Sequence, residues 1–274
     1  MKYIQLLAFA SITLFFVGCN QDKDQLTIID SSSFPNNQIT LGDEVIKYLT
    51  TDQLSTKTGK NLNEQNPVWG KMEEMIQTTK NVSKLKTDST WKALLSEYED
   101  FRINHIGTNG IPIALDSLTE FESTALARKW VELNVCLLKL SGEVRFGDAL
   151  EKILYDAKVP VLSAELLKSI IYTHNDDQIY LNIFGSSSLV HHHTTGGIIK
   201  LIQETSYPAS NEITLKCETN DVRYLNLFIR IPSWAVNPTV THGNVKYVPH
   251  PGEYCQISRM WKDGDEIRIV LKNK

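Results

Sequence analysis

The chain has 274 residues, of which 42% are apolar, 22% charged and 9% aromatic, and its formal net charge at neutral pH is −4. These proportions are typical of a globular protein and exclude a disordered, collagen-like or supercharged chain. With 28 basic against 32 acidic residues, the chain has no cationic excess of the kind that binds nucleic acid, and we expect no nucleic-acid partner. The cysteines are too few for a disulfide scaffold and lack the spacing of a structural zinc site: Cys19, Cys136, Cys217 and Cys255.

The first residues have the pattern of a bacterial export signal. Lys2 precedes an apolar stretch over residues 3–17, which is short for a membrane span but suits the hydrophobic region of a signal peptide. The stretch ends at Gly18 and Cys19, which resembles a lipobox, where the cysteine is acylated and becomes the new N-terminus. We expect Cys19 to attach the protein to a lipid bilayer, in the bacterial outer membrane or at the cell surface, with a periplasm-facing orientation as an alternative. A simple secretory signal that leaves Cys19 unmodified is the other alternative.

The next residues are polar. Residues 20–24 form an acidic patch that resembles the surface-export signal of Bacteroidetes lipoproteins, and Ser, Asn and Thr are frequent up to about residue 40. This composition predicts a flexible tether. The chain therefore divides into a lipoprotein signal with its lipid cysteine over 1–19, a tether over 20–42, a helical segment over 43–176 and a β-sandwich over 177–274.

Helical periodicity dominates the first half. Apolar residues follow one face of a predicted helix at Leu126, Trp130, Leu133, Leu137 and Leu140. Thr119 and Glu122 form the predicted capping box of this helix, and Gly142 is expected to end it. Further helices are predicted over about 68–79, 91–101, 143–157 and 164–172.

From residue 178 the period changes to two, which indicates strands. Apolar residues alternate over 179–183, 225–231 and 267–271, and further strands are predicted over 197–203, 212–218 and 253–258. Asp263 and Gly264 form a turn between two of them. The predicted fold class is α+β in two parts, a helical segment followed by an antiparallel β-sandwich.

Several segments in order carry a family resemblance. They are 177–184 (DQIYLNIF), 203–208 (QETSYP), 230–235 (RIPSWA) and 261–266 (WKDGDE), preceded by 140–148 (LSGEVRFGD) and 150–156 (LEKILYD). Together they resemble glycoside hydrolase family 127, the β-L-arabinofuranosidase-like proteins, over about residues 105–274. The resemblance implies a helical (α/α) barrel followed by β-sandwich domains, so the helical segment would be a barrel remnant. It also implies removal of a terminal β-linked L-arabinofuranose by a zinc-bound cysteine nucleophile, with a glutamate as acid/base.

The residues of that chemistry do not carry over. Counting back from Gly142 places Ser123 and Ala125 where the family has its Glu-x-Cys zinc ligands, and a shift by one position places Glu122 and Thr124 there. The adjacent cysteine pair of the family would lie between residues 155 and 179, and this chain has no cysteine between Cys136 and Cys217. We therefore expect no zinc and no other cofactor.

Other residues remain as weak candidates for chemistry. Glu120, Glu122 and Asp116 are carboxylates near the expected site, but helix capping explains Glu122 and the helix N-terminus suits Glu120. Glu151 and Tyr155 are expected to pack and hydrogen-bond between helices. Aromatic side chains that could stack on sugar rings are Trp234, Trp261, Tyr207 and Tyr254, with sandwich packing as the alternative.

The remaining histidines and cysteines have structural explanations. The run from His191 to His193 is expected to be an exposed polar loop, because adjacent side chains point in different directions and seldom bind one ion. Cys136 is expected to be a buried thiol, and Cys217 and Cys255 are expected to pack in the sandwich, with a disulfide between them as an alternative.

Three functions follow from these observations. The first is an exported, lipid-anchored protein that associates with arabinose-containing glycans without the zinc–cysteine site of the family. The second is an active glycoside hydrolase with a rebuilt site that removes terminal L-arabinofuranose or a related sugar. The third is a truncated remnant with no function.

Overall fold

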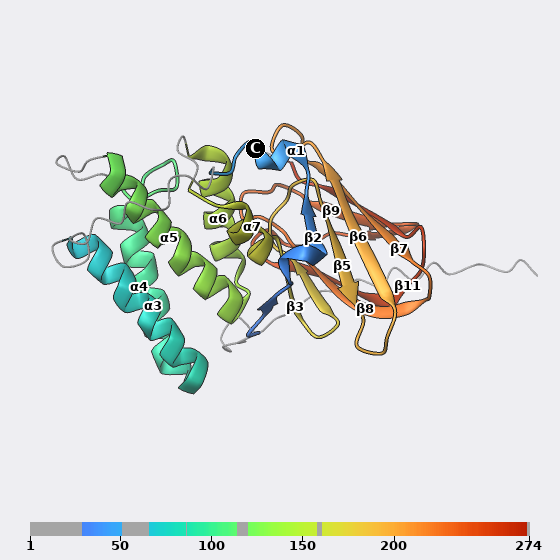
Figure 1. The fold of residues 1–274 in the computed structure, drawn as a ribbon, viewed down its shortest axis with the longest axis horizontal. Coiled ribbons are helices and arrows are strands. Elements are labelled where there is room, and N and C mark those ends of the chain that lie inside the picture. Colours follow the sequence, from blue (N-terminus) through green and yellow to red (C-terminus); the bar gives the residue numbers. More distant parts are fainter. Residues whose placement is uncertain (1–28, 51–65, 86, 114–119, 158–160, 273–274) are drawn as a thin grey trace, which may run out of the picture.

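The computed structural model describes residues 29–50, 66–85, 87–113, 120–157 and 161–272. Within these ranges the helices of residues 67–156 gather on one side of the molecule, and two sheets form a sandwich on the other (Figure 1). The helices are α1 (Asp43–Ile46), α3 (Pro67–Leu85), α4 (Asp88–His105), α5 (Glu120–Ser141), α6 (Val144–Asp156) and α7 (Ala164–Ile171), with a 3-10 helix η1 (Asn36–Gln38). No helix of the described residues has the length and apolar content to cross a membrane.

The helices form where the apolar period predicts them. Helix α5 buries the predicted stripe, including Trp130, Leu133 and Leu137, each of them no more than 1% exposed. It ends at Gly142, whose φ of 64° lies in the left-handed region and whose N–H donates to the Leu138 carbonyl at 2.8 Å. Thr119 of the predicted capping box and Cys19 of the predicted lipid anchor lie outside the described residues.

The strands of the described residues form two sheets. The five-stranded sheet has the order β1 (Ser32–Ser33), β3 (Tyr172–Asn175), β4 (Gln178–Leu181), β8 (Arg223–Arg230) and β11 (Tyr254–Trp261). The seven-stranded sheet has the order β10 (Val245–Tyr247), β9 (Thr239–His242), β12 (Glu266–Val270), β7 (Glu212–Thr219), β6 (Ile198–Thr205), β5 (Ser187–His192) and β2 (Ile39–Leu41). The predicted sandwich is confirmed, with one difference: β4 and β8 pair in parallel.

The sandwich core follows from the period of two. Leu225, Leu227 and Ile229 of β8 are buried, and the residues between them face the other side of the sheet. Strands β6, β7 and β12 show the same alternation. Asp263 and Gly264 lie in the connection between β11 and β12, as predicted, and Gly264 has a φ of 78°.

The N-terminal segment differs from its prediction. Within the predicted tether over 20–42, β1 pairs with β3 and β2 pairs with β5, so residues 32–41 are part of the sheets. The blue strand β2 lies beside β5 in Figure 1. Two buried apolar side chains, Ile39 and Leu41, hold this segment, which is too short to show a period in a polar sequence. Strand β3 likewise begins five residues before the predicted start of the sandwich at residue 177.

Candidate functional site

A buried arginine joins helix α6 to the sandwich. Arg230, the last residue of β8, has no exposed side-chain surface. Its guanidinium donates to Asp148 and Glu151 on α6, and its Nε–H donates to the Asn182 carbonyl. Burial alone would lower the pKa of Arg230, but the two nearby carboxylates raise it by more than burial lowers it. The net effect is a raised pKa, so the arginine stays charged.

Helix α6 is shaped to receive this side chain. Asp148 and Glu151 are three residues apart, so both project from the same face of the helix toward the sandwich. Gly147 precedes them, and a Cβ at this position would lie 2.6 Å from Cδ of Arg230. The glycine therefore lets the arginine pass close to the helix backbone.

Glu151 has donors on both of its oxygens. Oε1 accepts from the Tyr207 hydroxyl at 2.7 Å and from Nε1 of Trp234 at 3.3 Å, while Oε2 accepts from Arg230. All three partners donate, which suits an ionised carboxylate, whereas burial raises the pKa of Glu151 and opposes ionisation. We expected Glu151 to bond between helices, and its partners lie on the sandwich instead. The same holds for Tyr155, whose hydroxyl donates to the Phe184 carbonyl at 2.5 Å.

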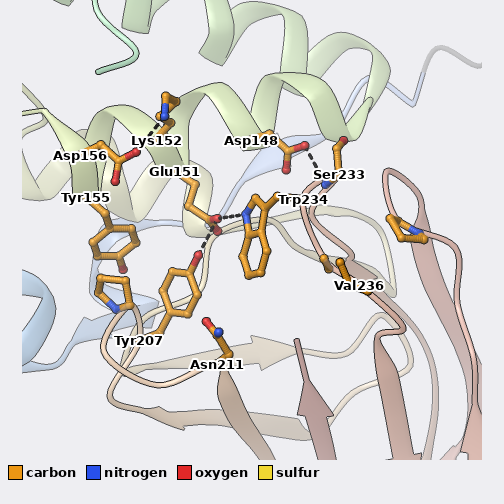
Figure 2. Close-up of a pocket in the computed structure, with 13 residues that line it drawn as sticks. Asp148, Glu151, Lys152, Tyr155, Asp156, Tyr207, Asn211, Ser233, Trp234 and Val236 are labelled. Carbon is orange, nitrogen blue, oxygen red and sulfur yellow. Dashed lines mark hydrogen bonds and ion pairs between the residues drawn. The ribbon is translucent and has the colours of Figure 1, made fainter. Parts of the chain in front are cut away.

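A pocket of about 780 Å³ lies beside these residues, between α6 and the loops at the end of the sandwich (Figure 2). Helix α6 contributes Asp148, Glu151, Lys152, Tyr155 and Asp156 to its lining. The sandwich side contributes Tyr207, Pro208, Asn211, Ser233, Trp234, Ala235, Val236 and Pro251. The volume falls within the ~300–1,000 Å³ of small-molecule sites.

The structure separates the predicted sugar-stacking residues. Trp234 and Tyr207 both line the pocket, and Trp234 is 36% exposed. Trp261 is 1% exposed and donates from Nε1 to the Leu225 carbonyl, so it packs inside the sandwich. Tyr254 is half-buried, and its hydroxyl donates to Oδ1 of Asn182 at 2.6 Å.

The predicted carboxylate candidates lie on or before helix α5. Glu120 begins α5, Glu122 follows within its first turn, and Asp116 lies outside the described residues. Glu122, whose side chain the structure describes, does not line the pocket described above. The carboxylates of the pocket come from α6 instead.

The cysteines are dispersed over the fold. Cys136 on α5 is half-buried, and burial raises its thiol pKa. Cys217 on β7 and Cys255 on β11 are buried and form no disulfide, so the alternative of a disulfide between them is not realised. Burial raises the pKa of Cys217 to about 12. Among the described residues, no His, Cys, Asp and Glu side chains form a group of three or more that could hold a metal ion.

The histidine run is a strand end and not an exposed loop. His191 and His192 belong to β5, and His191 is 4% exposed. Its Nε2 lies 2.8 Å from Oδ1 of Asp177, and Nε2 of His193 lies 3.3 Å from the other oxygen of Asp177. The prediction failed because the strand is polar and its partner Asp177 lies in the turn between β3 and β4.

Sequence reasoning missed the residue that organises the site. Arg230 interrupts the apolar end of β8 just before Ile231 and Pro232, and a charge at such a position is a usable signal of a buried ion pair. Asp148 and Glu151 with their spacing of three are the matching signal on the helix. Asn211 carries no signal, because only the fold brings it to the pocket.

Comparison with known proteins gives a family match for the sandwich. Residues 178–273 match the model of the β-L-arabinofuranosidase GH127 middle domain. No curated protein matches the chain. Three solved structures share its fold, with sequence identities of 16–19%.

The first of these structures is a GH127 β-L-arabinofuranosidase from Geobacillus stearothermophilus T6, with a TM-score of 0.59 and 16% identity over 73% of this chain and 41% of that one. The second is a glycoside hydrolase with a TM-score of 0.62 and 17% identity over 75% of this chain and 46% of that one. The third is a GH127 β-arabinofuranosidase with a TM-score of 0.61 and 19% identity over 75% of this chain and 42% of that one. The chain thus spans less than half the length of these structures. Residues 178–273 of its sandwich thus match the GH127 middle-domain model, and its overall fold resembles that of the GH127 β-L-arabinofuranosidases.

Proposed function

We propose that the protein is an exported, lipid-anchored, glycan-associated relative of the β-L-arabinofuranosidases that does not use the zinc–cysteine chemistry of that family. The observation that carries the glycan association is the pocket against the GH127-type sandwich, which combines a partly exposed tryptophan with carboxylate and amide side chains. Sugar sites combine such groups because a sugar ring has an apolar C–H face and polar hydroxyl edges. Two of the related structures are described as arabinofuranosidases, so arabinose-containing glycans are the first ligands to test.

The cysteine positions support the second part of the proposal. Retaining hydrolysis by the family route needs a thiolate activated by a metal ion. Position 125 is an alanine where the resemblance places a cysteine ligand, and the sequence has no cysteine over residues 137–216. The buried thiols Cys217 and Cys255 lie in different sheets.

The pocket itself gives Glu151 a structural task. A general acid must hold a proton and present it to the leaving oxygen. Burial raises the pKa of Glu151, and Arg230 only partly opposes this effect. Both oxygens of Glu151 are nevertheless bonded within the wall, to Tyr207, Trp234 and Arg230, so Glu151 anchors the wall and is poorly placed to hand a proton to a leaving group.

A binding screen of the purified protein without residues 1–19 tests the glycan association. Thermal-shift and glycan-array measurements with arabinose-containing oligosaccharides should show at least one ligand that raises Tm in a concentration-dependent way, since a ligand that binds only the folded state stabilises it. Absence of binding to all of them would contradict the proposal and leave the functionless remnant as the explanation.

An activity assay separates binding from hydrolysis. We expect no L-arabinose release from β-linked arabinofuranosides and no stoichiometric zinc by elemental analysis. The alternative is an active glycoside hydrolase, which the three carboxylates of the pocket, Asp148, Glu151 and Asp156, keep open. Release of L-arabinose at a rate that falls in Asp148→Asn or Asp156→Asn would establish that alternative and overturn the non-hydrolytic proposal.

A further inference from the structure

We propose that the pocket between α6 and the sandwich binds the end of a neutral oligosaccharide, with Trp234 as the stacking surface and with selection against acidic sugars. This inference rests on the proposed glycan association and assigns it a place and a ligand class. Three independent features of the pocket carry it: a fixed aromatic ring, an excess of carboxylates and a mixed polar and apolar wall.

The ring of Trp234 is held in place from one edge. Its Nε1–H donates to Oε1 of Glu151 at 3.3 Å, and Glu151 is itself held by Arg230, which has no exposed side-chain surface. With 36% of its surface exposed, the indole remains accessible to solvent beside the pocket. A ring that is oriented before binding loses little conformational freedom when a sugar stacks on it. Figure 2 shows the indole beside Tyr207 and above Asn211, on the pocket side of α6.

The charged groups around the pocket favour a ligand without negative charge. Asp148, Glu151 and Asp156 line it together with a single ammonium group, Lys152, whose Nζ lies 2.9 Å from Oδ2 of Asp156. Arg230 behind the wall adds a second positive charge, so acidic groups still outnumber basic ones by three to two. A ligand carboxylate or sulfate would be repelled by this excess, whereas hydroxyl groups can donate to carboxylate oxygens.

The rest of the wall suits a sugar with two kinds of surface. Pro208, Ala235 and Pro251 offer apolar contact, and Asn211 adds an amide that can both donate and accept. In Figure 2 the side chain of Asn211 points from the sandwich toward the space between Tyr207 and Trp234. Asn211 can bind sugar hydroxyl groups from the sandwich side, opposite the carboxylates of α6. A ligand in the pocket would therefore be contacted from both sides.

Titration calorimetry with two probes of matched length tests the inference. The neutral probe is arabinotriose, and the acidic probe is trigalacturonate. Trp234→Ala should weaken arabinotriose binding at least tenfold, Trp234→Phe should retain most of it because the apolar ring face remains, and Asn211→Ala should weaken it several-fold. Tyr224→Ala is the matched control, because Tyr224 is a 50% exposed aromatic residue of the sandwich that does not line the pocket.

The outcomes distinguish this inference from the proposed function. No binding of arabinotriose or of any other arabinose-containing oligosaccharide to the wild-type protein contradicts the glycan association itself. Binding that Trp234→Ala and Asn211→Ala leave unchanged contradicts only the assignment to this pocket. Tighter binding of trigalacturonate than of arabinotriose contradicts the selection against acidic sugars. Because Trp234 is partly exposed and Trp234→Phe keeps an aromatic ring, a loss of folding in Trp234→Ala would not remove the test.

Discussion

Arg230 is a charged residue whose side chain has no exposed surface. It lies on the sandwich and its two carboxylate partners lie on α6, so it connects the two halves through charge as well as hydrogen bonds. A buried ion pair gains little over an apolar replacement of both partners, but removal of one partner leaves a buried charge without compensation.

We therefore expect Arg230→Met to lower the free energy of unfolding by about 3–5 kcal/mol. Urea denaturation followed by circular dichroism measures this loss. Arg268→Met is the matched control, because Arg268 forms an exposed ion pair with Glu212 at 2.7 Å and should change the stability by less than about 1 kcal/mol. Equal losses in the two variants would show that burial of Arg230 has no special cost.

His191 should make the stability depend on pH. Burial lowers its pKa, and the neighbouring His174 and His193 lower it further, although the hydrogen bond to Asp177 opposes this effect. The folded protein thus binds a proton at His191 less readily than the unfolded chain, whose histidines titrate near pH ~6.5. The free energy of unfolding should accordingly fall as the pH is lowered from neutrality through that value toward the lower folded pKa.

Denaturation curves between pH 7.5 and pH 5 measure this dependence. His191→Gln should reduce the loss of stability on acidification, whereas His192→Gln should leave it unchanged, because the neighbouring His192 is exposed. A pH dependence that is the same in wild type and His191→Gln would assign the effect to other groups.

At the scale of elements, helix α6 passes close to the side chain of Arg230 at Gly147. Gly147 lies inside the helix, where glycine costs about 1 kcal/mol relative to alanine. The space that a Cβ would need is filled by the Arg230 side chain, which its partners hold in place. Packing against the sandwich therefore outweighs helix propensity at this position.

Two glycine substitutions compare these effects directly. Gly147→Ala should destabilise the protein despite the better helix propensity of alanine, because its Cβ would lie 2.6 Å from Cδ of Arg230. Gly70→Ala on α3 should be neutral or stabilising by up to about 1 kcal/mol, since no described atom beyond the local helix backbone lies within 4 Å of the added Cβ. Thermal unfolding of both variants measures the difference, and a stabilised Gly147→Ala would refute the role assigned to the close approach.

Strong periodicity made most elements predictable. The stripe of α5 and the alternation of β8 each recur over several turns or residue pairs, so local sequence is enough to find them. Strand β5 was missed because Ser187 and His191 are polar residues that the fold buries, and β1 and β2 were missed because their partners lie far away in the sequence. Their pairing is a property of the folded molecule.

The same limit applies to the site. Trp234 and Tyr207 could be named from residue type alone, since aromatic side chains are common in sugar sites. Their grouping with Asp148 and Asn211 could not, because it depends on how α6 packs against the end of the sandwich. The sequence pattern thus predicted the aromatic ring of Trp234 but not the pocket that it lines.

For the whole molecule, the proposed lipid anchor makes a prediction of its own. The full-length protein produced in a bacterial host should partition into the detergent phase of Triton X-114, because two or three acyl chains give stable membrane attachment. Cys19→Ser should move it to the aqueous phase or leave the precursor uncleaved. Cys136→Ser is the control and should partition like wild type. A wild-type protein found in the aqueous phase would show that Cys19 carries no lipid.

The attachment of residue 29 to helix α5 also limits how far the protein could reach from a membrane. The N–H of Ile29 donates to the Leu140 carbonyl at 3.0 Å, so only the ten steps from residue 19 to residue 29 separate a lipid on Cys19 from the folded body. At full extension these ten steps measure about 35 Å, which is less than the roughly 40–45 Å thickness of one bilayer with its headgroups. An acylated protein would therefore work close to its membrane, on glycan ends that come to it, and could not sample distant ones.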